Sequence, residues 1–186
     1  DAIADAGVSR VTVLAGWDES TVEPALRESA LAWTLLHPVE FMGNALEWAP
    51  ELVANDEVRT LSDWPSAMVH EADIAAVAVT ALTEPGHGGR TYQLTGPQAL
   101  TPAERVATLS GAVGRPLRWV RSTEAEERER LRGYGYGEED VEFGIALATQ
   151  PPQVGTVPQD TVPRVTGRPG RTFAQWAAEH ADAFGR

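Results

Sequence analysis

Short apolar runs, separated by polar and Gly- or Pro-containing turns, recur along the first hundred residues. Val11–Leu14 and Trp33–Leu36 are two such runs, and a polar, acid-initiated segment that ends near Ser29 lies between them. Apolar runs of this length with short connections are typical of buried parallel strands joined by a helix. The pattern therefore predicts a strand–helix–strand unit and an α/β fold.

Turn and capping residues mark the later elements. Thr101 with Glu104, and Thr123 with Glu126, have the spacing of a capping box, in which each side chain accepts a hydrogen bond from the other residue's backbone. Further strands are predicted over Val58–Leu61, Ala67–Val69, Thr91–Leu94 and Leu117–Val120. Helices are predicted from Pro38 to about Asn55, over Asp73–Leu82, from Thr101 to Gly114, from Thr123 to Arg132, over Glu138–Thr149, over Asp160–Thr166 and after Thr172.

The stretch from Ala32 to Trp48 concentrates the candidate chemistry. Pro38 has no N–H and is predicted to stop strand pairing. His37 then lies at the carboxyl end of a strand, which is where open α/β sheets bind ligands. A histidine there could act as a general acid or base near neutral pH. The alternative is a hydrogen-bonded histidine with a structural role only.

Several side chains near the strand ends are candidates for a substrate pocket. Trp17, Phe41, Met42 and Trp48 could supply apolar walls, and core packing is the competing interpretation, strongest for Trp48. Asn44 could supply a polar contact, or it could lie on the surface of a helix. His70 is a further candidate at the start of a helix.

A metal site is not predicted beside His70. Adjacent residues in a strand-to-helix turn point in different directions, so Glu71 and Asp73 cannot share a metal ion with this histidine. Capping of the following helix by Glu71 or Asp73 is the better interpretation. The charged run Glu124–Arg132 is most simply a solvated helix face with paired charges.

Composition narrows the classes of function. The 186-residue chain has a formal net charge of -12, so it lacks the basic surface that a nucleic-acid partner would require. All 15 basic side chains are Arg, and the heavy use of Ala, Gly and Pro suggests a bacterial source. No apolar run has the length of a membrane span, and no signal peptide opens the chain, so we expect a cytoplasmic protein.

The chain resembles the NmrA-like proteins, which are atypical members of the short-chain dehydrogenase/reductase superfamily. Its Ala32–Trp48 stretch is similar to the W-T-x-L-R-P-x-x-F-x-x-N segment of that family, with His37 in the place of the Arg. Further similar segments follow the family's order: Ala6–Val8, Val22–Glu23, Leu26–Ser29, His70–Ala75, Tyr92–Pro97 and Thr172–Trp176. The resemblance covers nearly the whole chain but only the second half of the family.

The resemblance implies a partial Rossmann-like parallel sheet that contains the later strands of the family's sheet. Residues 1–100 would be the C-terminal half of an NAD(P)-binding fold. Residues 101–186 would be a mainly helical substrate-binding part, packed with the first part as one domain. By the same resemblance, Ala15, Gly16, Pro38 and Val39 would contact the nicotinamide, with the first half of the fold present.

The resemblance also leads to predictions about partners. The strand Val11–Leu14 would be the fourth of the family's sheet, and without its neighbour it would be an exposed apolar edge. We expect a missing N-terminal segment or a second copy of the chain, as a homodimer, to cover it. The sequence has no glycine-rich phosphate-binding turn in a strand–turn–helix context. NAD or NADP is therefore expected only with the missing half, and no cofactor is expected for the chain alone.

Three functions remain open at this point. The first is an NAD(P)-dependent oxidoreductase that reduces a small carbonyl or quinone-like substrate, as the resemblance implies. The second is a cofactor-free ligand-binding protein, or a non-redox cyclase or isomerase, that works as a homodimer. The third is a regulator that senses the dinucleotide without turnover.

Overall fold

A three-stranded parallel sheet forms one half of the molecule. The computed structural model of the chain describes residues 3, 6–16, 21–150 and 152–185. Strands β1 (Arg10–Leu14), β2 (Ala32–Pro38) and β4 (Arg90–Leu94) lie in the order β1-β2-β4. The central strand is the most deeply buried, as its apolar sequence predicts. The predicted α/β fold with a parallel sheet is confirmed.

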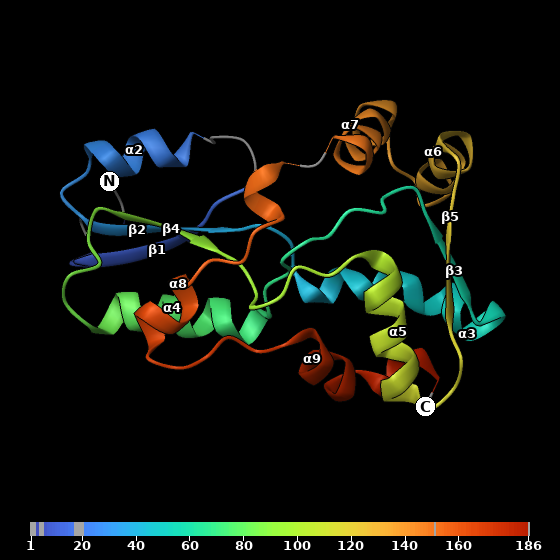
Figure 1. The fold of residues 1–186 in the computed structure, drawn as a ribbon. Helices are drawn as coiled ribbons and strands as arrows, with labels where there is room; N and C mark the ends of the chain where they lie inside the picture. Colours follow the sequence, from blue (N-terminus) through green and yellow to red (C-terminus); the bar gives the residue numbers. More distant parts are fainter. Residues whose placement is uncertain (1–2, 4–5, 17–20, 151, 186) are drawn as a thin grey trace.

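Helices cover both faces of this sheet (Figure 1). Helix α2 (Val22–Glu28) packs on one face, and α4 (Glu71–Thr83) and α8 (Thr161–Thr166) pack on the other. Helix α4 packs against β1, β2 and α8 and buries Ile74, Val77 and Ala81, whereas Val79 and Leu82 on its other side are exposed. The buried side chains here form one apolar cluster: Leu36, Val69, Ile74, Val77, Tyr92, Leu94 and Val162.

The other half of the molecule is built around a separate two-stranded sheet. Strand β3 (Glu57–Thr60) pairs in parallel with β5 (Arg118–Arg121), so the early and late parts of the chain meet here. The largest core cluster lies beside it and includes Trp48, Leu52, Leu109, Trp176 and Phe184. It is supplied by η1 (Met42–Trp48), α3 (Ala49–Asn55), α5 (Pro102–Val113), α9 (Phe173–Glu179) and η3 (Ala181–Phe184).

Two charged helices complete this half. Helix α6 (Glu124–Gly133) packs against α7 (Glu138–Thr149), and a short turn, η2 (Gln153–Gly155), follows. Ion pairs join the two helices, Arg128 with Glu142 and Arg132 with Glu138. A small apolar cluster around Leu61, Val141 and Ile145 lies beneath them. Among the described residues, no helix is long and apolar enough to span a bilayer.

The predicted capping boxes are confirmed at the starts of α5 and α6. Thr101 and Glu104 exchange side-chain-to-backbone hydrogen bonds, and Thr123 and Glu126 do the same. These boxes depend on residues three apart and on backbone N–H groups that no helical carbonyl can reach. A local motif of this kind is therefore readable without knowledge of the tertiary fold.

Two local predictions were wrong. Strand β2 does not stop before Pro38, because Pro38 pairs with Leu94 and the N–H of Val39 then donates to the Leu94 carbonyl. A proline at the last strand position removes one ladder bond only. The segment 67–69 is not a strand; it contains one isolated bridge, Phe41–Val69, and follows another, Ser66–Leu100. The loop after β4 runs directly beside it, and a Cβ at Gly96 would lie 2.0 Å from the Met68 carbonyl oxygen.

Candidate functional site

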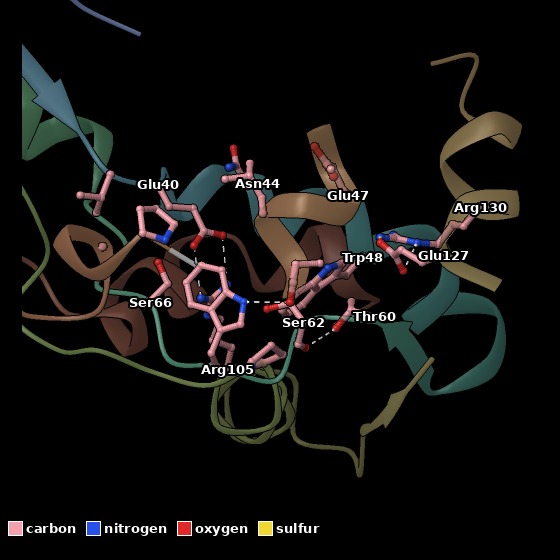
Figure 2. A pocket seen from close by; sticks show the side chains of 18 residues that line it. Glu40, Asn44, Glu47, Trp48, Thr60, Ser62, Ser66, Arg105, Glu127 and Arg130 are labelled. Carbon is pink, nitrogen blue, oxygen red and sulfur yellow. Dashed lines mark hydrogen bonds and ion pairs between the residues drawn. The ribbon is translucent and has the colours of Figure 1, made fainter. Parts of the chain in front are cut away.

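A pocket of about 320 Å³ opens at the carboxyl end of β2 (Figure 2). It lies between the segment that follows β2, the loop after β3, the start of α5 and the two charged helices α6 and α7. The lining residues are Val39, Glu40, Asn44, Glu47, Trp48, Thr60, Ser62, Trp64, Ser66, Pro102, Arg105, Glu127, Arg130, Gly144, Leu147, Ala148, Pro152 and Gly155. Its volume is at the lower end of the range for small-molecule sites.

An ion pair between Glu40 and Arg105 forms one wall of the pocket. Glu40 follows β2, and its two carboxylate oxygens accept hydrogen bonds from Arg105 Nη1 and Nη2 at 3.1 and 3.3 Å. Arg105 Nε donates to the Leu100 carbonyl at 3.2 Å, and the guanidinium carbon lies 5.9 Å from the centroid of the Trp48 ring. Arg105 is only 4 % exposed, so its charge depends on Glu40 for compensation.

A second ion pair, between Glu127 and Arg130, lies at the α6 side of the pocket. Arg130 Nη2 donates to Glu127 Oε1 at 2.5 Å, and Arg130 Nε donates to Glu127 Oε2 at 3.3 Å. Oε2 also accepts from the N–H of Leu61 and the hydroxyl of Ser122. Burial by itself lowers the pKa of Arg130, but the hydrogen bond and charge of Glu127, and secondly the contact with Tyr134, outweigh this effect and the net direction is upward.

Two tryptophans supply the flat apolar surfaces of the pocket. Trp48 is buried at the end of η1, and Trp64 lies in the loop after β3. The indole N–H of Trp64 donates to the Ala148 carbonyl at 3.1 Å, which joins this loop to α7. The hydroxyl-bearing residues Ser62 and Ser66 line the pocket between these groups. The site can therefore hold a flat ring and offer it hydrogen bonds.

The four predicted nicotinamide contacts lie together at one edge of the main sheet. Ala15 and Gly16 follow β1, which pairs with β2 up to Leu14 opposite Leu36. The Ala15 N–H donates to the Leu36 carbonyl at 2.8 Å. Pro38 and Val39 end and follow β2, and Val39 also lines the pocket. The two segments therefore lie at the carboxyl ends of neighbouring strands, and Val39 joins this end of the sheet to the pocket.

His37 lies beside this edge, at the next-to-last position of β2. It is half-buried, and its backbone carbonyl accepts a hydrogen bond from Gln93 Nε2 at 2.6 Å. It is not among the residues that line the pocket. The acid–base role of His37 stays a prediction.

The predicted substrate contacts are distributed between the pocket and the core. Asn44 lines the pocket, whereas Met42 is buried in the largest core cluster and Phe41 packs against the cluster under the main sheet. Trp17 lies outside the described residues.

His70 caps α4 itself, so the prediction that Glu71 or Asp73 provides the cap was wrong. Its Nδ1 accepts from the Ala72 N–H at 3.1 Å, and its Nε2 lies 3.2 Å from a Glu179 carboxylate oxygen. Glu71 instead accepts from the Gly43 N–H, and Asp73 accepts from the Arg171 backbone. Among the described residues, no group of three His, Asp or Glu side chains could hold a metal ion.

Sequence reasoning did not single out Arg105, Trp64 or the Glu127–Arg130 pair. The run Glu124–Arg132 was interpreted as a solvated face, and most of it is, but Glu127 is only 6 % exposed. One signal was available, because Glu127 and Arg130 are three residues apart on a helix whose start is fixed by a capping box. What the sequence could not show is that this face meets the loop after β3.

The chain is similar to two curated bacterial reductases, although no family model matches it. It is 44 % identical over 162 residues to an NAD(P)H azoreductase of Xenophilus azovorans, covering 86 % of this chain and 57 % of that protein. It is 42 % identical over 166 residues to a (4-alkanoyl-5-oxo-2,5-dihydrofuran-3-yl)methyl phosphate reductase of Streptomyces griseus, covering 87 % of this chain and 58 % of that protein. The chain thus spans less than two thirds of either relative.

Solved structures show the same fold. The NADPH-dependent quinone oxidoreductase of Escherichia coli superimposes with a TM-score of 0.77 at 22 % identity, over 96 % of this chain and 70 % of that chain. The negative transcriptional regulator NmrA in complex with NAD superimposes with a TM-score of 0.58 at 17 % identity, over 86 % of this chain and 55 % of that chain. The chain therefore has the fold of NAD(P)-binding reductases and of NmrA.

Proposed function

We propose that this chain is the C-terminal, substrate-binding half of an NmrA-like NAD(P)H-dependent oxidoreductase that reduces a small carbonyl or quinone-like compound. The position of the pocket carries the proposal. Val39 and Glu40 directly follow β2 and line the pocket, so it adjoins the sheet edge where the fold family binds nicotinamide. The similarity to an NAD(P)H azoreductase and the fold of an NADPH-dependent quinone oxidoreductase support the same chemistry.

The residues at this edge suit a nicotinamide ring. None of the residues Ala15, Gly16 and Pro38 has a charged or large side chain. The backbone hydrogen bond from Ala15 to the Leu36 carbonyl holds Ala15 in place. Apart from Gly16 itself and its chain neighbours, no described atom lies within 4 Å of the place that a Cβ on Gly16 would take. The cofactor, when bound, would supply the hydride. The residues of this chain would bind the acceptor and orient it against that edge.

The pocket suits a flat acceptor with one or two rings. Trp48 and Trp64 offer aromatic surfaces, and the two ion pairs and the serine hydroxyls offer polar contacts around them. A ring held between aromatic side chains keeps one face in a fixed orientation, which is what transfer to a single atom requires.

Acceptor-dependent oxidation of NADPH and NADH tests the proposal. The protein encoded by the full reading frame that contains this chain is mixed with either nucleotide and with 1,4-naphthoquinone or an azo dye. We expect oxidation of at least one nucleotide. Ala148→Trp, which fills the pocket, should raise the KM for the acceptor and leave the KM for the nucleotide unchanged. Val157→Trp, at an exposed position, is the matched control.

Two results would contradict the proposal. Absence of any acceptor-dependent oxidation would remove the reductase function. Tight nucleotide binding without turnover would favour the regulator that senses the dinucleotide.

We also propose that an additional strand covers the free edge of β1. In the described part of the chain β1 pairs with β2 on one side only. An open apolar edge favours pairing with another strand. Light scattering separates the two sources of that strand. A monomeric full-length protein would place the strand in a segment outside this chain, and a dimer that dissociates when Val13 is replaced by Pro would place it in a second copy.

A further inference from the structure

A hydroxyl group in the pocket wall has no partner in the described part of the protein. Ser66 lines the pocket and is only 3 % exposed, and its Oγ makes no hydrogen bond to a described residue. This oxygen is not sealed in the core, because Arg130 Nη1 is the one described side-chain atom that is both fully buried and unpaired. The small accessible surface of Ser66 therefore includes its hydroxyl, and it lies in the pocket that Ser66 lines.

The main chain on both sides holds this hydroxyl in place. The Ser66 N–H donates to the Leu100 carbonyl, and the Leu100 N–H donates back to the Ser66 carbonyl, each at 3.0 Å. At the next residue, the Ala67 N–H donates to the Gly155 carbonyl at 2.8 Å. A donor on a backbone fixed in this way loses little freedom when it binds a ligand, which favours affinity.

The hydroxyl lies at the end of the pocket that faces the main sheet. Gly155, which is bonded to the residue after Ser66, packs against the residue that follows β2, because a Cβ on Gly155 would lie 3.8 Å from the Val39 Cβ. Figure 2 shows Ser66 at the Glu40 end of the pocket, opposite the labelled residues of α6. A group bound to Ser66 would therefore be close to the sheet edge where we expect the nicotinamide.

The charged groups at this end are already engaged with one another. The guanidinium nitrogens of Arg105 donate to Glu40 and to the Leu100 carbonyl, and both Glu40 oxygens accept from Arg105. The ion pair therefore closes one side of this end, and the Ser66 hydroxyl beside it keeps an open donor. Buried donors are rarely left without an acceptor, so this O–H group calls for an acceptor atom from a ligand.

We propose that the Ser66 hydroxyl donates a hydrogen bond to the acceptor group of the substrate, of the kind that a quinone carbonyl oxygen or an azo nitrogen presents. This inference rests on the proposed function for the identity of the pocket, and it names the side chain that orients the group to be reduced. Trp64 lies two residues earlier in the same loop and also lines the pocket, so its indole would contact the ring beside that group.

The test measures binding by calorimetry in the protein encoded by the full reading frame. It is made without nucleotide and with NADP⁺ or NAD⁺, which carry no hydride to transfer. The probes are three fused-ring compounds: 1,4-naphthoquinone offers only acceptor atoms, indole offers only a donor, and naphthalene offers neither. We expect Ser66→Ala to weaken naphthoquinone binding about fivefold and to leave the binding of indole and naphthalene unchanged.

Ser9→Ala is the matched control. It removes an exposed serine hydroxyl that does not line the pocket, so this variant should bind all three probes as the unsubstituted protein does. Thermal unfolding provides a second readout. Because the Ser66 hydroxyl has no partner among the described residues, Ser66→Ala should melt at the same temperature as the control. A clear fall in its melting temperature would show that the hydroxyl bonds within the protein, and would overturn the proposal.

Four binding results would also overturn it. The first is a folded Ser66→Ala that binds naphthoquinone with unchanged affinity. The second is equal weakening of all three probes, which describes lost packing, and the third is weakening of indole alone, which describes a hydroxyl that accepts. The fourth is failure of the unsubstituted protein to bind naphthoquinone in any of the conditions. If Ser66-dependent binding is found but no nucleotide is oxidised, the proposed reductase function fails and the acceptor site stands.

Discussion

The two ion pairs that face the pocket have the same composition but differ in how completely they are satisfied. Arg105 uses both of its Nη groups on Glu40 and its Nε on the Leu100 carbonyl. Arg130 uses Nε and Nη2 on Glu127 and leaves Nη1 without a described partner. Each nitrogen of the Arg105 guanidinium therefore has a hydrogen-bond partner, whereas one nitrogen of the Arg130 guanidinium has none among the described residues.

The Glu40–Arg105 pair ties elements together, because each of the three Arg105 nitrogens has a hydrogen-bond partner and the pair joins the end of β2 to the start of α5. The Glu127–Arg130 pair is anchored mainly through Glu127, which also accepts from the Leu61 N–H and the Ser122 hydroxyl. Both pairs compensate a buried charge, so removing either partner should destabilise the fold.

Removal of Glu40 should cause the largest loss of stability. Glu40→Ala leaves the Arg105 charge almost fully buried and without its carboxylate, which should cost about 3 kcal/mol of unfolding free energy. Urea denaturation measures it. Glu40→Leu combined with Arg105→Met should recover most of the loss, since no buried charge then remains. A loss well under about 1 kcal/mol in the single variant would show that the pair is not structural.

Removal of Arg130 should cost less stability. Arg130→Met leaves the buried Glu127 carboxylate without its cation, but Glu127 keeps its bonds from Leu61 and Ser122, so we expect a loss of about 2 kcal/mol in the same measurement. The contrast with Glu40→Ala is the informative quantity. Equal losses from both substitutions would mean that the two pairs have the same structural role.

Removal of the Ser122 hydroxyl should have a smaller effect. Ser122→Ala deletes one of four hydrogen bonds to Glu127 and should cost about 0.5 kcal/mol. Urea denaturation measures this loss, and a loss as large as that of Arg130→Met would contradict the assignment of most of the Glu127 interaction to Arg130.

The smallest expected effect is a pH dependence at the helix starts that carry the two arginines. Hydrogen bonds from the Thr101 backbone, and secondly from its hydroxyl, hold the pKa of Glu104 below its usual value of 4.5, and Thr123 does the same for Glu126. Because the folded-state pKa is the lower one, this stabilisation is present above pH 4.5 and is lost as the pH falls through the folded value.

Glu104→Gln tests this pH dependence. Glutamine can keep the hydrogen bonds of the box, so the fall in melting temperature on acidification should become slightly smaller than in the unsubstituted protein. The box at α9 is a natural model for this change, because Thr172 there is paired with Gln175. A larger fall in the variant would contradict the assignment.

Much of the fold was readable from sequence because its signals are local. The apolar run of β2 and the boxes at Thr101 and Thr123 each depend on residues within a few positions. The errors at Pro38 and at residues 67–69 concern pairing with segments far along the chain. Whether Pro38 pairs depends on β4, and no local pattern contains that information.

Of the residues that line the pocket, sequence reasoning pointed only to some of those that directly follow β2. The stretch after Pro38 was correctly expected to lie at a strand's carboxyl end, and Val39 and Asn44 from that stretch line the pocket. Arg105 and Arg130 come from helices that begin more than sixty residues later. Their participation depends on how α5 and α6 pack, so it becomes visible only in three dimensions.

Because the two sheets are separate, the pocket wall formed by α6 can change without a change in the main sheet. No described strand joins β3 and β5 to the main sheet, and α6 follows β5 directly. The wall that carries Arg130 can therefore vary in sequence and length without a change in the register of the strands that form the expected nicotinamide edge. Sequence changes in this wall can therefore reshape the pocket while the carboxyl ends of β1 and β2 stay constant.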